Sequence, residues 1–144
     1  MKKGHNIVLD WDGTLVPSMW PGQPTEFMPG AVQALFALHR AGHQLIVHSA
    51  RLTPFDPVTS RKRDAGIVKQ EVDYVRRTLD DKGLTFVKIW TLPGKPPGSA
   101  YVDDKAYRYT GRPRSWHAMT EKLLVALGGE EALFPHFDLE AAHE

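Results

Sequence analysis

Four short apolar runs, each bounded by turn-forming residues, punctuate the first two thirds of the chain. They span residues 6–9, 44–48, 85–90 and 100–102. Continuous apolar runs of this length, rather than alternating ones, predict strands that are buried on both faces of a parallel sheet. The sequence therefore predicts four parallel strands.

Between and after these runs, apolar residues recur every three or four positions, which predicts amphipathic helices. The first helix begins in the turn at Pro29 and ends at Gly42, the second covers about residues 58–82, and the last begins at Ser115 as N-cap and ends at Gly128. Their apolar stripes are Val32, Leu35, Phe36 and His39; Ala65, Val68, Val72, Val75 and Leu79; and Met119, Leu123, Leu124 and Leu127.

Two segments lack such periodicity. Four prolines and a glycine fall within residues 17–29, which excludes a helix and favours an exposed loop. Trp20 and Phe27 in this loop are candidates for a small flap. Residues 130–144 form a weakly patterned C-terminal tail.

Strands that alternate with helices indicate an α/β fold. We expect a three-layer Rossmann-like parallel sheet with helices on both faces. The 144 residues fit one domain, so we expect a single domain over residues 1–144, with residues 130–144 as its tail.

The composition of the chain argues against several classes of protein. The chain has 18 Lys and Arg against 17 Asp and Glu, a net charge of +1, which makes a nucleic-acid partner unlikely. It has no cysteine, which excludes disulfides, thiolate metal sites and a cysteine nucleophile. The apolar run before Asp10 is only three residues long, too short for a secretory signal, and no apolar run would span a membrane. We expect a cytoplasmic protein that does not bind membranes.

Polar residues follow three of the four predicted strands. Asp10 and Asp12 follow the first, Ser49 follows the second, and Asp103 and Asp104 follow the fourth, with Lys95 in the loop before it. Ligands of such sheets bind at the carboxyl ends of the strands. Clustered carboxylates favour a hard cation such as Mg²⁺, and a carboxylate beside Mg²⁺ is able to attack a phosphoryl group.

The motifs IVLDWDGTLV, LIVHS, Lys95 and YVDD, in this order, resemble those of the haloacid dehalogenase-like (HAD) superfamily of phosphohydrolases. The resemblance covers residues 7–104, and DxDGT behind a strand is its most specific part. It implies a phosphoric monoester hydrolase with Mg²⁺ as cofactor and an aspartyl-phosphate intermediate. The spaces after the first motif and between Ser49 and Lys95 are too short for a cap domain, which implies a capless member with an open site.

By position, the resemblance implies that Asp10 is the nucleophile and that Asp12 is the general acid and then the general base. Ser49 and Lys95 would hold the phosphoryl group. Asp10, Asp12 (through its carbonyl), Asp103 and Asp104 would bind the metal, and the order of the last two stays open. Further candidate substrate contacts are Trp11, Gly13 and Arg51; a packed Trp11 and a solvent-exposed Arg51 are the alternatives.

Several alternatives share these residue types. A phosphate-responsive signalling module also uses acids, a hydroxyl, a lysine and Mg²⁺, but a receiver domain has its acid pair early and its acceptor aspartate on a middle strand. A nucleic-acid end-processing module rests only on the basic residues 61–63, which are interleaved with acids. An open site suits a large phosphorylated substrate or a site covered by a second subunit, so a homo-oligomer is possible. Substrate identity stays open.

Overall fold

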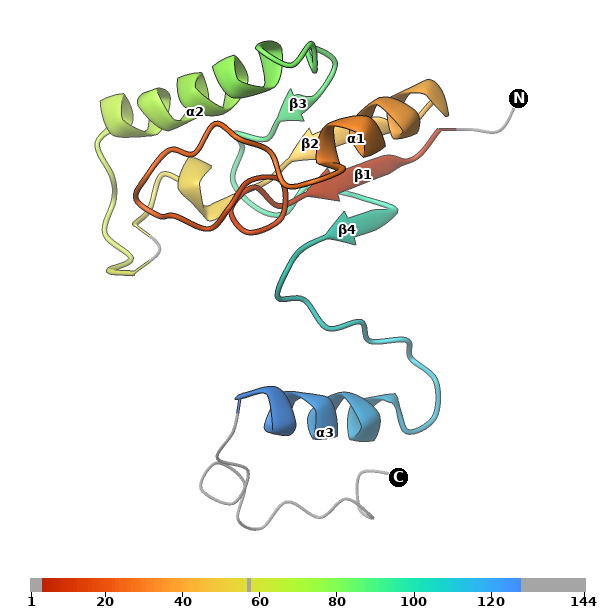
Figure 1. Ribbon diagram of the computed structural model, residues 1–144. Coiled ribbons are helices and arrows are strands. Elements are labelled where there is room, and N and C mark those ends of the chain that lie inside the picture. The colour runs from red at the N-terminus through yellow and green to blue at the C-terminus, as the bar shows by residue number, and fades with distance from the viewer. Residues whose placement is uncertain (1–3, 57, 128–144) are drawn as a thin grey trace. The chain divides into compact units, whose positions relative to one another are not determined.

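The structure is a computed structural model that describes residues 4–56 and 58–127 (Figure 1). Its internal contacts separate two compact units, Met1–Asp104 and Lys105–Glu144. All four strands and both candidate acid pairs belong to the first unit. The expected single domain over residues 1–144 stays a prediction, and the tail predicted at residues 130–144 lies outside the described residues.

The first unit contains a four-stranded, all-parallel sheet in the order β3-β2-β1-β4 (Figure 1). The strands are β1 (Asn6–Leu9), β2 (Gln44–Val47), β3 (Lys88–Ile89) and β4 (Ala100–Val102). In register, Leu9 lies opposite Val47 on one side and opposite Val102 on the other. The residues that follow β2, β1 and β4 therefore emerge side by side at one edge of the sheet.

Helices α1 (Ala31–Arg40) and α2 (Ala65–Asp80) flank this sheet. The core joins alternate strand residues to the buried stripes of both helices; it includes Ile7, Leu9, Leu45, Val47, Leu35, Val75 and Leu79. Val8 and Ile46, the alternate positions, are also buried, and Gly98 lies against Val8. The α/β class with a parallel sheet flanked by helices, consistent with a Rossmann-like three-layer fold, is confirmed.

The second helix begins later than its sequence pattern predicts. The carboxylate of Asp56 accepts hydrogen bonds from the backbone N–H groups of Val58 and Thr59, which makes a turn there. Asp64 then caps α2 by accepting from the N–H of Gly66 at 2.8 Å. The predicted start at residue 58 was wrong because Ser60 has a φ of 60° and the chain turns back there, with the N–H of Asp56 donating to the carbonyl of Arg61.

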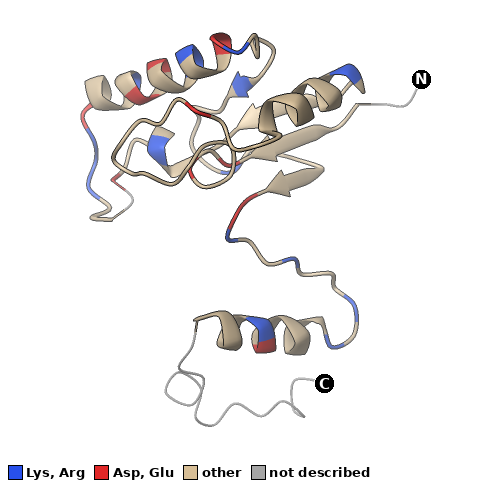
Figure 2. Cartoon of the chain, in the orientation of Figure 1, with Lys and Arg blue, Asp and Glu red and all other residues tan. Residues whose placement is uncertain are grey.

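Charges of both signs alternate along α2 (Figure 2). Lys69 pairs with Asp73 at 3.1 Å, and Arg76 pairs with Asp80 at 2.8 Å, each one turn along the helix. Arg76 also donates to the carbonyl groups of Leu84 and Val87. Two of the basic side chains of α2, Lys69 and Arg76, therefore have a structural role.

The proline-rich loop is fastened to the body of the first unit. The N–H of Met28 donates to the carbonyl of Leu15, and the ring of Phe27 packs edge-on against Trp11. The indole of Trp20 lies over the guanidinium of Arg51, 4.8 Å away. Phe27 therefore packs beside the core instead of forming the expected flap.

The second unit contains α3 (Ser115–Leu127). The ring of Tyr109 lies 5.1 Å from that of Trp116 and packs on the first turn of this helix. Met119, Leu123 and Leu124 of the predicted stripe are partly buried, whereas Leu127 is exposed. Over residues 4–56 and 58–127, no helix is long and apolar enough to cross a membrane.

Candidate active site

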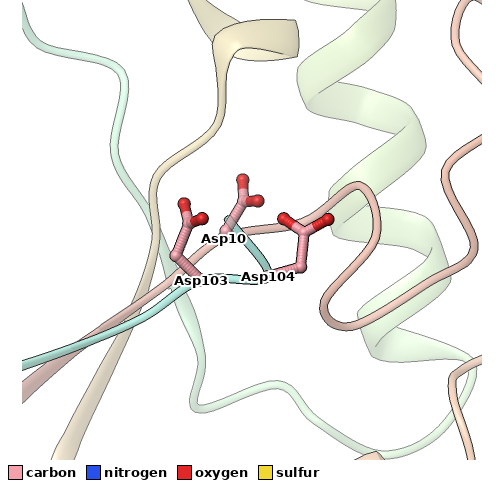
Figure 3. Close-up of side chains that lie close together, drawn as sticks. All are labelled: Asp10, Asp103 and Asp104. Carbon is pink, nitrogen blue, oxygen red and sulfur yellow. The ribbon is translucent and has the colours of Figure 1, made fainter. Parts of the chain in front are cut away.

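Three carboxylates meet at the edge of the sheet where β1 and β4 end (Figure 3). One oxygen each from Asp10, Asp103 and Asp104 lies within 4.8 Å of the other two. The backbone brings them together, because the N–H of Asp10 donates to the carbonyl of Val102 at 2.9 Å and so extends the pairing of the two strands by one residue. The structure thus joins the first and last acidic motifs of the sequence.

Asp10 is the most buried of the three carboxylates, and its pKa is raised. Burial raises its pKa to about 6 from an ordinary 3.8; the N–H of Trp11 opposes this rise, and the charges of Asp103, Asp104 and Asp12 add to it. Negative charge is therefore concentrated around a half-buried carboxylate. A cation at this point would relieve the repulsion.

The geometry of this cluster requires a glycine at position 13. Its φ is +80°, and a Cβ atom at this position would lie 2.4 Å from Oδ2 of Asp104. Both the backbone conformation and the space therefore require glycine. Its N–H donates to the carbonyl of Val16 at 2.7 Å, so this hydrogen is used within the turn, and a substrate contact at Gly13 stays a prediction.

We expect Gly13→Ala to weaken Mg²⁺ binding by at least about tenfold, the scale seen when a group that positions a metal ligand is altered, because its Cβ must displace Asp104. Gly42→Ala is the matched control: Gly42 has a φ of +92° but nothing within 4 Å of its Cβ position. Both variants carry the cost of left-handed backbone, on the order of 1–2 kcal/mol. Titrating Mg²⁺ and following the melting temperature separates the two effects. Equal metal affinity in both variants would contradict the proposed contact.

Asp12 does not contribute an oxygen to the three-carboxylate cluster. Its side chain forms a two-pronged ion pair with Arg51, from Nη2 to Oδ1 at 2.6 Å and from Nε to Oδ2 at 3.1 Å. Nη1 of Arg51 donates to Glu71 at 2.9 Å, and Nη2 also donates to the carbonyl of Gly22 at 2.7 Å. The pair fixes the orientation of the Asp12 carboxylate.

Trp11 and Arg51, both candidate substrate contacts, are buried; Trp11 is packed, as its alternative had it, whereas Arg51 is not solvent-exposed. The Arg51 side chain is 0% exposed and its donors are used within the protein. Trp11 is also 0% exposed, and its Nε1 donates to the hydroxyl of Tyr74 at 3.2 Å. Tyr74 in turn donates to the carbonyl of Pro24. Both side chains therefore stabilise the loop that follows β1 from its buried side.

Sequence reasoning missed the partners of Arg51 on α2. Glu71, Tyr74 and Thr78 lie on the buried face of that helix beside Val75 and Leu79. A pattern search that counts apolar positions alone leaves this polar strip out. The spacing of Glu71, Tyr74 and Thr78, at intervals of three and four, was a usable signal, because charged and hydroxyl side chains there lie on the same face as the core residues.

Ser49 and Lys95 complete the sequence-predicted set. Ser49 follows β2, is 6% exposed, and its Oγ accepts from the N–H of Arg51 at 3.2 Å. The ammonium of Lys95 lies 4.0 Å from the centre of the Tyr101 ring. Burial, and next the positive charge of Lys95, lower the pKa of His48. Lys95 thus acts electrostatically on the residue that adjoins Ser49.

The donor set fits a hard divalent cation. Asp10, Asp103 and Asp104 offer carboxylate oxygens from two adjacent strand ends, and oxygen ligands are those that Mg²⁺ prefers. Gly13 leaves the room that Asp104 occupies, and the pKa of Asp10 is raised first by burial and then by the charges of Asp103, Asp104 and Asp12. The residues present therefore suit Mg²⁺, with Asp103 and Asp104 equally placed as ligands.

No protein-family model and no curated protein matches this chain. A solved structure, that of a conserved protein from Bacteroides thetaiotaomicron, is similar to it, with a TM-score of 0.49 and 20% sequence identity. The similarity covers 92% of this chain and 98% of that one.

Proposed function

We propose that the protein is a Mg²⁺-dependent phosphatase that hydrolyses a phosphomonoester through an aspartyl-phosphate on Asp10. One observation carries the proposal: the carboxylates of Asp10, Asp103 and Asp104, which are 93 or more positions apart in sequence between the first and last motifs, come within 4.8 Å of one another. The order of motifs that resembles the HAD superfamily supports the same chemistry.

In the first step, an oxygen of Asp10 attacks phosphorus and the bond from phosphorus to the leaving alcohol oxygen breaks. The leaving oxygen takes a proton from the carboxylic acid form of Asp12, whose side chain Arg51 holds in a fixed orientation. In the second step, a water molecule attacks phosphorus and gives its proton to Asp12. The bond from phosphorus to the Asp10 oxygen then breaks, which releases inorganic phosphate and restores the Asp10 carboxylate and the protonated Asp12.

The other residues bind charge. Asp10, Asp103 and Asp104, together with the backbone carbonyl of Asp12, would hold Mg²⁺. When bound, Mg²⁺ supplies positive charge to the phosphoryl oxygens and offsets the repulsion between them and the nucleophile. Ser49 would donate its hydroxyl hydrogen to one of these oxygens, and Lys95 would place its ammonium beside another.

The proposal predicts a steady release of phosphate from a generic aryl phosphate that depends on Mg²⁺. Removing the metal with EDTA should lower the rate by at least about 100-fold, because phosphoryl transfer depends on charge neutralisation for most of its catalysis, and Mg²⁺ should restore it. A panel of phosphorylated metabolites assayed in the same way would give the substrate class.

Two outcomes would contradict the proposal. A rate that is the same in EDTA and in Mg²⁺ would exclude a role for the acidic cluster as a metal site. A stable phosphorylated Asp10 without continued phosphate release would instead favour a phosphate-responsive signalling module. Mass spectrometry of the acid-quenched protein distinguishes that outcome from turnover.

A further inference from the structure

A cleft of about 170 Å³ opens beside Ser49, at the carboxyl end of β2. One wall is formed by residues 52–55 and the other by residues 90–94, with His48 and Ser49 lining the cleft between them. Leu9 and Val47 are paired in register, and the N–H of His48 donates to the carbonyl of Leu9. His48 therefore sits next to Asp10, one strand spacing away, about 4.8 Å in a sheet.

The chemistry of the cleft differs from that of the acidic cluster. Among the described residues that line it, none is Asp, Glu, Lys or Arg. Phe55 is 53% exposed and Leu92 is 63% exposed, so two large apolar side chains face water at its walls. Burial, and next the charge of Lys95, lower the pKa of His48, which favours its uncharged form. A phosphoryl group would lose its hydration here without gaining a charged partner.

Both walls are held in place by hydrogen bonds, so the cleft exists before anything binds. Arg63 donates to the carbonyls of Arg51 and Thr53, which holds the first wall. On the second wall, the N–H of Trp90 donates to the carbonyl of Val47, and its indole Nε1 donates to the carbonyl of Gly94 at 3.0 Å. Preformed walls reduce the entropy lost on binding.

We propose that this cleft binds the leaving group of the substrate, and that this group carries a single flat, uncharged ring. The inference rests on the proposed phosphatase function and adds the substrate class. Sites that enclose whole drug-sized ligands measure about 300–1,000 Å³, so the cleft has room for a fragment only. The phosphoryl group stays outside, at Asp10, while Phe55 and Trp90 offer aromatic surface to the ring.

The experiment compares benzyl phosphate with ethyl phosphate, because both release an alkyl alcohol and differ chiefly in the ring. We expect kcat/KM of the wild-type protein with Mg²⁺ to favour benzyl phosphate by at least about tenfold, on the scale of the 1–3 kcal/mol gained when an aromatic ring stacks in a site. Phe55→Ala should reduce this ratio to near one, and Leu92→Ala, on the opposite wall, should reduce it in part. Ile67→Ala, which removes a half-exposed apolar side chain on α2 outside the cleft, should leave the ratio unchanged.

The outcomes separate this inference from the function on which it rests. Equal rates for the two substrates, or a ratio unchanged in both wall variants that melt like wild type, would overturn the cleft as the leaving-group site while the phosphatase stands. Hydrolysis of neither substrate, nor of any aryl phosphate, would overturn the phosphatase proposal and this inference with it. A benzyl preference that Phe55→Ala removes supports both.

Discussion

Asp10→Asn is expected to lower the Mg²⁺-dependent phosphatase rate by at least about 10³-fold, because an amide oxygen does not replace the attacking carboxylate and losses of this size or more follow the removal of a nucleophile. The variant changes one atom in a side chain that is only half buried. Phosphate release at saturating aryl phosphate measures the loss. A rate within tenfold of wild type would remove Asp10 as the nucleophile.

The same variant is expected to be more stable than wild type at pH 7.5 in EDTA, which separates lost chemistry from lost folding. The folded pKa of Asp10 is about 6 and the ordinary value is 3.8, so between these pH values the folded protein binds a proton that the unfolded chain has released. The contribution of Asp10 to stability is therefore greatest below about pH 4 and falls as the pH rises through 6. Asparagine removes this dependence.

Melting temperatures in EDTA from pH 4 to pH 8 test this sign. Asp81→Asn is the matched control, because it neutralises an exposed aspartate at the end of α2, outside the acidic cluster. The control should keep both the activity and the pH dependence of wild type. A metal-free Asp10→Asn protein that melts below wild type at pH 7.5 would contradict the raised pKa of Asp10, which burial and then the neighbouring charges cause.

The edge of the sheet at which the acids lie was predictable because the polarity of parallel strands decides it. Asn6–Leu9 and Ala100–Val102 are strands at the predicted residues, and Asp10, Asp103 and Asp104 follow them directly. Parallel strands place their carboxyl ends at one edge whatever surrounds them. Knowledge of which strands pair was therefore not needed to bring these acids to the same edge.

The direction of individual side chains was less predictable, because it depends on packing between distant segments. Trp11 lies between two acids, and the sequence alone does not decide whether its side chain faces solvent or the core. Tyr74, 63 residues later, provides the buried hydrogen-bond partner. Arg51 follows Ser49 by two residues, which suggested a substrate contact. Glu71, 20 residues later on α2, draws its guanidinium inward instead.

Arg51→Met is expected to destabilise the protein by about 3–5 kcal/mol, the range found when one member of a buried ion pair is removed. Glu71 and Asp12 would keep their charges with side chains only 11% and 19% exposed, and neither would have its guanidinium partner. For a unit of this size we expect the melting temperature to fall by more than about 10 °C. Hydrogen bonds to Asp12 and Glu71 outweigh burial and raise the pKa of Arg51, so titration of the arginine is no alternative explanation.

Lys69→Met is the matched control, since Lys69 also pairs with an aspartate on α2 but its side chain is 78% exposed. We expect a change below about 0.5 kcal/mol for it. Adding Glu71→Gln to Arg51→Met should recover part of the loss, because the double variant no longer buries that unpaired charge. A double variant as unstable as the sum of the two single variants would show that the pair is not coupled.

Arg51→Lys tests whether the ion pair with Asp12 affects catalysis as well as stability. Lysine keeps the charge but lacks the planar fork that holds both oxygens of Asp12, so the carboxylate gains rotational freedom. Because Arg51 is buried behind Asp12 and does not reach the substrate, we expect kcat to fall by about tenfold or more, as general acid–base catalysis contributes 10²–10⁴-fold, while KM changes little. A change confined to KM would instead place Arg51 at the substrate and contradict its role in orienting Asp12.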